Sequence, residues 1–256
     1  MTFRIATLNL EQDHKRWPER RTLILEQLGQ IRPDILTLNE VCLPHQTGRW
    51  LQQSARDRLG LAYRLVQQSK TNHLATVEGE AILTRYPIFE TANFDYQTQG
   101  MVAQVARLEV EGQLLDVYVT HLYRSRGEDA LRLYQVQQLL AWIESRQGDG
   151  VAAVVCGDFN ATMEMPSAQL MAQRFRPSQL EPTAFTPLQG EDGAVSHPYW
   201  PRFDRCIDYI WISEGLHVTT SEVGFNRPSP TDPTLWPSDH AGVWADLQFA
   251  PDPRGP

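Results

Sequence analysis

The amino-acid sequence predicts a layered domain of mixed α and β structure. A strand-like alternation over Phe3–Leu8 is followed by apolar residues at helical spacing, and then by a second strand-like run at Ile35–Asn39. This strand, helix, strand opening is typical of α/β proteins. The chain has 256 residues, of which 41% are hydrophobic, enough to bury one large core without splitting. We therefore expect one domain over residues 1–250 and a short tail over 251–256.

Helical and strand patterns then follow one another along the chain. We expect helices at Trp17–Gln30, Gly48–Leu59 and Glu128–Arg146, and Pro33 suits the stop after the first helix because its ring cannot continue the backbone hydrogen bonding. Strands are expected at Phe3–Leu8, Ile35–Asn39, Tyr63–Gln67, Glu80–Thr84, Met101–Val110, Leu114–Thr120, Val151–Cys156, Ile207–Ile212, His217–Val223 and Ala241–Phe249. The stretch Arg176–Arg205, rich in Pro, Gly, Ser and Thr, is expected to form surface loops.

The charge and the cysteines narrow the function classes. A net charge of -8 and a pI near 5.4 argue against a broad basic surface that grips nucleic acid, because neutralising phosphates needs clustered Lys and Arg. The three cysteines, Cys42, Cys156 and Cys206, are widely spaced in apolar sequence, so free buried thiols are expected rather than disulfides or a zinc cluster. No leader pattern and no membrane-spanning run is seen, so we expect a cytoplasmic protein without stable membrane association.

Polar side chains gather where the predicted strands end. Asn9, Glu40, His121, Asp158 and Asn160 each come at or just after the carboxyl end of a strand. In sheet proteins of this kind, strand ends form the mouth where ligands bind. Two further groups reach the same mouth if their strands run antiparallel to the others: Asp208, which begins a strand, and Asp239-His240, which immediately precede one.

This set of residues suits phosphoester hydrolysis. Several carboxylates at one mouth repel one another unless a cation joins them, and oxygen ligands without Cys favour Mg²⁺ or Mn²⁺. Cleavage of a phosphoester needs charge neutralisation, a carboxylate or base for the attacking water, and donors for the transition state. Asp239 places a candidate metal ligand beside the His240 imidazole, and Asp208 could hold the far nitrogen of that ring.

The ordered motifs resemble the endonuclease/exonuclease/phosphatase family over almost the whole chain. The motifs are Thr7-Leu8-Asn9, Leu38-Asn39-Glu40, Thr120-His121-Leu122, Gly157-Asp158-Phe159-Asn160, Ile207-Asp208-Tyr209-Ile210 and Ser238-Asp239-His240. The resemblance implies a DNase I-like, four-layer α/β/β/α sandwich, in which two mixed β-sheets pack face to face with helices outside. It also implies an α/β enzyme that cleaves phosphoesters with Mg²⁺ or Mn²⁺, using one or two ions.

The resemblance also implies a role for each residue. Glu40 would be the principal metal ligand, with Asn9 and Asp239 beside it. Asp158 would orient or deprotonate the attacking water, and Asn160 would donate to a phosphoryl oxygen. Three further residues are implied to be catalytic. His240, held by Asp208, would act as a second acid/base or contact phosphate. His121 would contact phosphate or protonate the leaving oxygen. A glutamate at the start of the strand Glu80–Thr84 could orient His121.

Two positions depart from the family pattern. Asn39 stands where Gln commonly precedes the metal-ligating Glu, a change that leaves Glu40 itself intact. Gln99-Gly100-Met101 stands where many relatives place an Arg that could contact phosphate. The sequence therefore does not show which residue, if any, contacts the substrate phosphate at this point.

Three readings of the function remain open from the sequence. The first is a phosphodiesterase, a nuclease acting on nucleic acid or nucleotides, expected as a monomer. The second is a phosphatase or phospholipase C-type enzyme acting on a phosphorylated small molecule, inositol phosphate or lipid headgroup. The third is a non-catalytic module that uses the fold for binding, which the full set of catalytic residues disfavours. The sequence does not identify the substrate.

Several other residues have a structural and a functional reading. Trp200, Phe203, Trp211 and Trp236 could stack on bases, although packing is the commoner role of such residues. Basic pairs at Lys15-Arg16 and Arg124-Ser125-Arg126 could meet phosphates or form solvated charged loops. Arg132 and Gln135, nearly one helical turn apart, are expected to stabilise the long helix or its packing.

Overall fold

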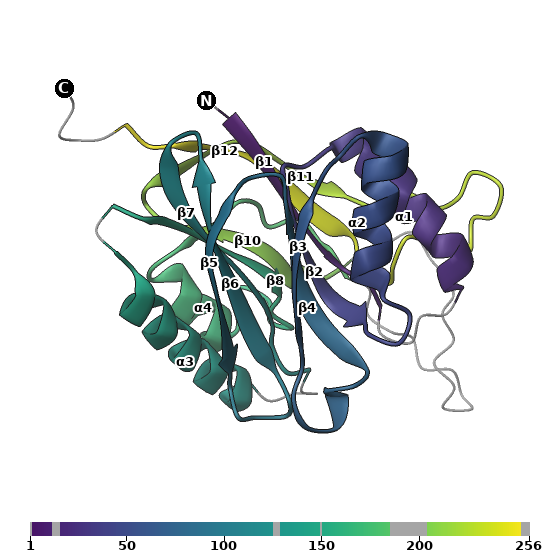
Figure 1. Cartoon of the computed structure of the whole chain (residues 1–256). Helices are drawn as coiled ribbons and strands as arrows, with labels where there is room; N and C mark the ends of the chain where they lie inside the picture. The colour runs from purple at the N-terminus through teal and green to yellow at the C-terminus, as the bar shows by residue number, and fades with distance from the viewer. Residues whose placement is uncertain (1, 12–15, 125–128, 149, 185–203, 252–256) are drawn as a thin grey trace.

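A computed structural model describes residues 2–11, 16–124, 129–148, 150–184 and 204–251. The described chain forms two six-stranded sheets that pack face to face, with helices on both outer surfaces (Figure 1). This confirms the predicted four-layer α/β/β/α sandwich. No helix in the described part of the chain is long and apolar enough to cross a membrane.

The first sheet contains the two ends of the domain. Its strands, in spatial order, are β11 (Leu216–Gly224), β12 (Gly242–Phe249), β1 (Thr2–Asn9), β2 (Ile35–Cys42), β4 (Glu78–Thr84) and β3 (Arg64–Ser69). Only β1 and β2 are parallel, and the helix α1 (Trp17–Ile31) provides their crossover connection. The helices α1 and α2 (Thr47–Leu59) cover the outer face of this sheet.

The second sheet repeats this arrangement with its own parallel pair. Its strands, in spatial order, are β5 (Ile88–Asp95), β6 (Val102–Val110), β7 (Gln113–His121), β8 (Ala152–Asp158), β10 (Asp208–Ile212) and β9 (Arg176–Pro177). β7 and β8 are parallel and are joined through α3 (Ala130–Arg146). The outer face is covered by α3 and by α4 (Pro166–Ala172).

The inner faces of the two sheets meet in one apolar core. Ile5, Ile35 and Ile82 of the first sheet lie in the same buried cluster as Val117 and Val154 of the second. The run Val151–Cys156 was expected to be buried on both faces, and β8 is buried at every position because the other sheet covers one side and α3 the other. The core therefore packs the parallel pair β1 and β2 of the first sheet against the parallel pair β7 and β8 of the second.

Most predicted elements are present, and the differences have local causes. The sequence analysis missed β5, an edge strand whose exposed positions weaken the alternation, and also missed the seven-residue helix α4 and the single 3₁₀ turn Asn72–Leu74. The predicted strand Glu80–Thr84 begins two residues earlier, at Glu78. Of the expected loops, residues 185–203 lie outside the described residues, as do most of the tail and Glu128 at the predicted start of the long helix.

Gly157 lies opposite Thr120 in the parallel pairing of β7 and β8. Its φ is +129°, and a Cβ added there would meet the Thr120 carbonyl oxygen at 2.0 Å and the Asn39 Oδ1 at 2.9 Å. A side chain at this position would therefore push apart the two strands that end in His121 and Asp158.

We expect Gly157→Ala to destabilise the protein by at least about 3 kcal/mol, because the added methyl group overlaps a backbone oxygen that cannot swing away. Thermal unfolding followed by circular dichroism measures this loss. The matched control is Gly112→Ala: Gly112 also has a positive φ, of +82°, but a Cβ there meets nothing within 4 Å, so about 1 kcal/mol is expected. Equal losses in the two variants would contradict the steric explanation.

Candidate active site

The strand ends bring the predicted residues to one mouth of the sandwich. Asn9 is paired in register with Asn39 in the first sheet, and His121 is paired with Asp158 in the second. The late strands meet the condition on which Asp208, Asp239 and His240 could reach this mouth, because they pair antiparallel to their neighbours. Asp208 lies opposite Asp158 at the start of β10, and β12, which follows His240, runs antiparallel to β1. The side-chain contacts below connect seven of the eight predicted residues, and the eighth, Asp239, acts on Glu40 and His240 through its charge.

Asp158 lies at the centre of these contacts and is 2% exposed. Its Oδ2 accepts a hydrogen bond from Asn9 Nδ2 at 3.2 Å and lies 3.6 Å from His121 Nε2 and 3.8 Å from His240 Nε2. Its Oδ1 accepts from the backbone N–H of Asn160 at 2.7 Å. Burial and the nearby Asp208 raise the pKa of Asp158 to about 7. The carboxyl group can therefore exchange a proton near neutral pH.

The pairing of His240 with Asp208 is as predicted. His240 Nδ1 lies 2.9 Å from Asp208 Oδ2, an oxygen that also accepts from the Thr183 hydroxyl at 2.7 Å. Burial lowers the pKa of His240, but the charges of Asp208, Asp239 and Asp158 outweigh burial and raise it well above its ordinary value. The imidazole therefore carries a positive charge at neutral pH and is fixed in orientation.

Glu40 sits on a strained piece of backbone. Its φ is +55°, and the pairing of β2 with β4 shifts register between Leu38 and Val41. A β-bulge of this kind turns a side chain out of the regular alternation and is common beside active sites. The Glu40 carboxylate accepts from Asn9 Nδ2 at 3.1 Å, and its side chain is 17% exposed. Burial, Glu78 and Asp239 raise the pKa of Glu40 to about 8.

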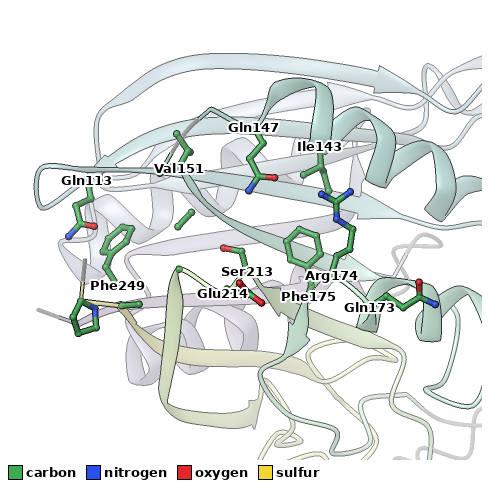
Figure 2. A pocket seen from close by; sticks show the side chains of 15 residues that line it. Gln113, Ile143, Gln147, Val151, Gln173, Arg174, Phe175, Ser213, Glu214 and Phe249 are labelled. Atoms are coloured by element: carbon green, nitrogen blue, oxygen red, sulfur yellow. The ribbon is translucent and has the colours of Figure 1, made fainter. Parts of the chain in front are cut away.

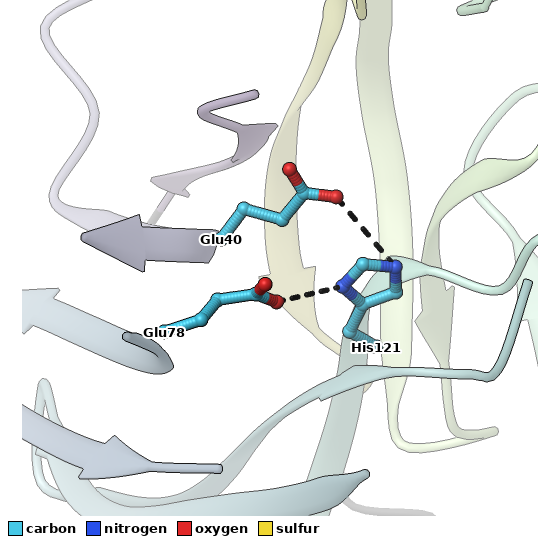
Figure 3. Close-up of side chains that lie close together, drawn as sticks. All are labelled: Glu40, Glu78 and His121. Atoms are coloured by element: carbon cyan, nitrogen blue, oxygen red, sulfur yellow. Dashed lines mark ion pairs between the residues drawn. The ribbon is translucent and has the colours of Figure 1, made fainter. Parts of the chain in front are cut away.

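His121 lies between Glu40 and a second glutamate (Figure 3). Its Nε2 is 4.0 Å from Glu40 Oε1, and its Nδ1 is 3.8 Å from Glu78 Oε1. A glutamate was expected beside this ring at the start of the strand Glu80–Thr84; the carboxylate near Nδ1 is that of Glu78, where β4 begins, and the buried Lys70 lies nearer, at 3.1 Å. Glu80 instead accepts from Asn39 Nδ2 at 2.5 Å. Burial and the charge of Lys70 lower the pKa of His121 well below its ordinary value.

Asn39, noted in the sequence only as a departure from Gln, connects the two sheets. Its Nδ2 donates to Glu80 in the first sheet and to the Thr120 carbonyl oxygen in the second, at 3.0 Å. Its Oδ1 accepts from the backbone N–H of Asp158 at 2.9 Å. The side chain is fully buried, so these bonds hold β2, β7 and β8 at the mouth.

The acidic groups at this mouth fit a divalent cation. Among the described residues, two groups of three side chains have ligand atoms within 4.8 Å of one another: Glu40, Glu78 and His121, and Asp158, Asp208 and His240. Asn9 and Asp239 belong to neither group. Asn9 turns its amide nitrogen toward Glu40 while its oxygen accepts from the backbone N–H of Glu11 at 3.0 Å. To act as a metal ligand, Asn9 would have to turn its amide over.

The other residues that the sequence singled out are held in packing, ion-pair or backbone contacts where the structure describes them. Trp211 and Trp236 are buried, at 0% and 3% exposure, so packing is their role. Arg16 pairs with Glu19 and Asp232. Arg132 and Gln135 bind the backbone of Tyr123, just after the His121 motif. Cys42, Cys156 and Cys206 are free thiols, as expected. Lys15, Ser125, Arg126, Trp200 and Phe203 lie outside the described residues.

A large hollow lies at the opposite end of the sandwich. It has a volume of about 1160 Å³ and is lined by residues that include Gln147 after α3, Val151 before β8 and Phe249 at the end of β12 (Figure 2). Because β8 runs from this hollow toward Asp158, the hollow and the predicted site lie at opposite ends of the same strand. The hollow contains none of the predicted site residues.

Comparison with known proteins agrees with this geometry. The sequence profile of the Endonuclease/Exonuclease/phosphatase family matches residues 6–240. Nocturnin of Xenopus laevis is 30% identical over 268 residues, which cover 93% of this chain and 66% of the relative. Nocturnin of Homo sapiens is 28% identical, over 94% of this chain and 60% of the relative. The chain thus spans somewhat less than two thirds of the length of these relatives.

Solved structures show the same fold over nearly the whole chain. The human Nocturnin catalytic domain with a bound sulfate anion has a TM-score of 0.69 and 26% identity, and the match covers 97% of this chain and 94% of that domain. An endonuclease/exonuclease/phosphatase from Bacteroides vulgatus has a TM-score of 0.77 with 17% identity, over 98% of this chain and 100% of that one. The family profile, spanning from the end of β1 to His240, shows that this chain belongs to the endonuclease/exonuclease/phosphatase family.

Proposed function

We propose that this protein is a Mg²⁺- or Mn²⁺-dependent phosphodiesterase that cleaves single-stranded nucleic acid or nucleotides. The observation that carries the proposal is the placement of the Asp158 carboxylate within 4 Å of Asn9, His121 and His240, with His240 held by Asp208. These are the groups that phosphoester hydrolysis requires, gathered at one mouth.

The acidic donor set supports binding of a hard cation. Glu40 is the proposed principal ligand, with Asp239 and the amide of Asn9 beside it. Buried carboxylates that repel one another are stabilised when a divalent ion joins them. The raised pKa values of Glu40 and Asp158 reflect burial first and then repulsion from neighbouring carboxylates. A cation held there by Glu40, Asp239 and Asn9 would supply charge neutralisation at the phosphoryl oxygens.

The protein side chains provide the remaining steps. Asp158 Oδ2 is placed to orient the attacking water and accept its proton, and a pKa of about 7 suits a base near neutral pH. The positively charged His240 is placed to donate to a phosphoryl or leaving oxygen. The Asn160 side chain, whose residue has a φ of +49°, is turned toward His121 and lies 3.1 Å from its Nε2. These groups meet charge that develops during cleavage.

Two observations bear on the choice of substrate class. The acidic chain favours small or single-stranded substrates over a duplex held by a basic surface. A TDP2 structure from D. rerio, whose 14% identity shows likeness of fold alone, was solved with a single-strand DNA product. The alternative, a phosphatase or phospholipase C-type activity, makes a different prediction in the same assay.

We expect purified protein to cleave bis-p-nitrophenyl phosphate and single-stranded DNA or RNA with Mg²⁺ or Mn²⁺, and to lose this activity in EDTA. Asp158→Asn is expected to slow turnover about 10²- to 10⁴-fold, because the water loses its base. Asp57→Asn is the matched control, since the Asp57 side chain is 61% exposed on the surface of α2. Cleavage of inositol phosphates, sphingomyelin or phosphomonoesters in place of nucleic acid would favour the alternative.

Glu40→Gln and His121→Ala should separate metal binding from chemistry. We expect Glu40→Gln to weaken Mg²⁺ or Mn²⁺ binding at least about tenfold and to abolish turnover, because a neutral amide is a poorer ligand. His121→Ala is expected to leave metal affinity unchanged while slowing turnover. Isothermal titration calorimetry of each variant measures the affinity. Equal affinity of wild type and Glu40→Gln would remove Glu40 from the metal site.

The raised pKa values also predict how pH affects the metal-free protein. The folded state raises the pKa of Glu40 from 4.5 to about 8, so it holds the proton more tightly than the unfolded chain does. The stability that this provides is lost as pH rises through about 8. The lowered pKa of His121 makes stability rise with pH, but only below pH 6.5, the ordinary pKa of a histidine. Between pH 6.5 and 8 the Tm in EDTA should therefore fall.

Saturating Mg²⁺ should remove this fall, because the cation stabilises the charged carboxylates. Glu40→Gln in EDTA should show a shallower pH dependence than wild type and a higher Tm at pH 8, since the amide does not ionise. Differential scanning fluorimetry across the pH range measures both. A wild-type profile in EDTA with the same slope as Glu40→Gln would contradict the assignment to Glu40.

A further inference from the structure

Lys70 is a buried cation that the proposed mechanism has not yet used. It follows the last residue of β3 and is 1% exposed. Its ammonium group forms an ion pair with Glu78 and lies 3.7 Å from Glu80 Oε1. It also lies 3.1 Å from Nδ1 of His121. Burial opposes the charge, but the two glutamates outweigh it and raise the pKa of Lys70.

The contact between Lys70 and His121 has a fixed direction. An ammonium group has three N–H donors and no acceptor, so Nδ1 of His121 must accept. A neutral imidazole that accepts at Nδ1 carries its proton on Nε2. The opposite tautomer would need Nδ1 to donate to Glu78 Oε1, but that separation is 3.8 Å, too long for a hydrogen bond.

The Nε2 atom faces the proposed catalytic groups. It lies 3.6 Å from Asp158 Oδ2 and 3.1 Å from Asn160 Nδ2, whose amide donates to the Leu122 carbonyl oxygen at 3.0 Å. Asn160 Nδ2 is also a donor, so a neutral ring can accept from Lys70 or from Asn160 but not from both, and the charged Lys70 is the stronger donor. With the proton on Nε2, two donors then stand side by side at this point. Neighbouring donors are satisfied together when one anionic oxygen accepts from both.

We propose that Lys70 is a positioning residue that holds His121 as the neutral Nε2–H tautomer, so that His121 and Asn160 together donate to one phosphoryl oxygen of the substrate. This proposal rests on the proposed phosphodiesterase function for its catalytic consequence, but not for the tautomer itself. It assigns His121 the role of a hydrogen-bond donor, and it leaves Asp158 as the base that accepts the proton of water.

The tautomer can be observed directly in the wild-type protein. Long-range ¹H–¹⁵N correlation spectra of protein labelled with ¹⁵N-histidine distinguish a protonated ring nitrogen from an unprotonated one, and His121→Gln identifies the His121 signals by their loss. We expect Nδ1 of His121 to be unprotonated and Nε2 to be protonated. A proton on Nδ1, in either a neutral or a charged ring, would overturn the proposal even if the protein proves to have no phosphodiesterase activity.

Charge-matched variants test whether Lys70 is the cause. Lys70→Met combined with Glu78→Gln removes the donor without leaving an extra buried carboxylate, and Glu78→Gln alone is the control that keeps the donor. We expect the double variant to lose the fixed tautomer and to lower kcat about 10- to 100-fold with little change in KM, as when the partner that orients a histidine is removed. Lys70→Arg, which retains a donor, should restore most of kcat. An unchanged tautomer in the double variant would overturn the role of Lys70.

A cycle with His121 then separates positioning from direct contact with substrate. If Lys70 acts through His121, the Lys70→Met and Glu78→Gln pair should cause no further loss of kcat in a His121→Gln background. Additive losses would show that Lys70 acts independently of the ring and would overturn the proposal. Thermal unfolding of each variant confirms that folded proteins are being compared. Absence of turnover in wild type would count against the proposed function alone, since the spectra still report the tautomer.

Discussion

The site depends on a buried amide that joins the two sheets. Asn39 donates to Glu80 and to the Thr120 carbonyl oxygen, and it accepts from the backbone of Asp158. A face-to-face packing of apolar sheets is non-directional and would allow them to slide by a fraction of a residue. Directional bonds from one side chain to both sheets fix their offset at the mouth. Glu40, the next residue in the chain, and Asp158 are placed relative to each other by this connection.

Charge is the second constraint on the site. Glu78, Glu80 and Asp158 are buried, and the positive side chains beside them are Lys70 for the two glutamates and His240 for Asp158. The negative charges of the two sheets have different partners. Lys70 neutralises the glutamates of β4 in the first sheet, while His240 lies beside Asp208 and Asp158 of the second. Glu40 and Asp239 remain without a cationic side chain of their own among the described contacts, which is where we place the metal ion.

Much of the fold could be predicted because its signals are local. Periodicity located the buried strands and amphipathic helices, and Gly157-Asp158-Phe159-Asn160 located the end of β8. The edge strand β5 was missed because only β6 pairs with it and five of its eight residues are exposed. The four-layer stacking followed from family resemblance rather than from periodicity, since no local pattern records which sheet faces which.

For the candidate site, the sequence predicted the residues at strand ends but not the buried lysine beside them. The residues at strand ends are brought together, and the Asp208–His240 pair is present, because strand direction alone places them. Lys70 was missed because it stands in polar sequence, Gln68-Ser69-Lys70-Thr71, that resembles a solvated surface turn. Its burial arises from pairing of β3 with β4 and from contacts with β7, which are distant in sequence. For the same reason, a glutamate at the start of the strand Glu80–Thr84 was expected beside His121, without Lys70.

The pairing of β1 with β12 joins residues 2–7 to residues 243–248, almost the full length of the chain. Ser238, Asp239 and His240 come just before β12, and the Ser238 hydroxyl donates to the carbonyl oxygen of Asn9 at 2.6 Å. During synthesis, the first strand must therefore wait for the last before this half of the mouth can form. A ribosome-bound chain therefore cannot assemble this half of the mouth until residues 238–248 have been synthesised, so the contact order of the fold sets when the site can form.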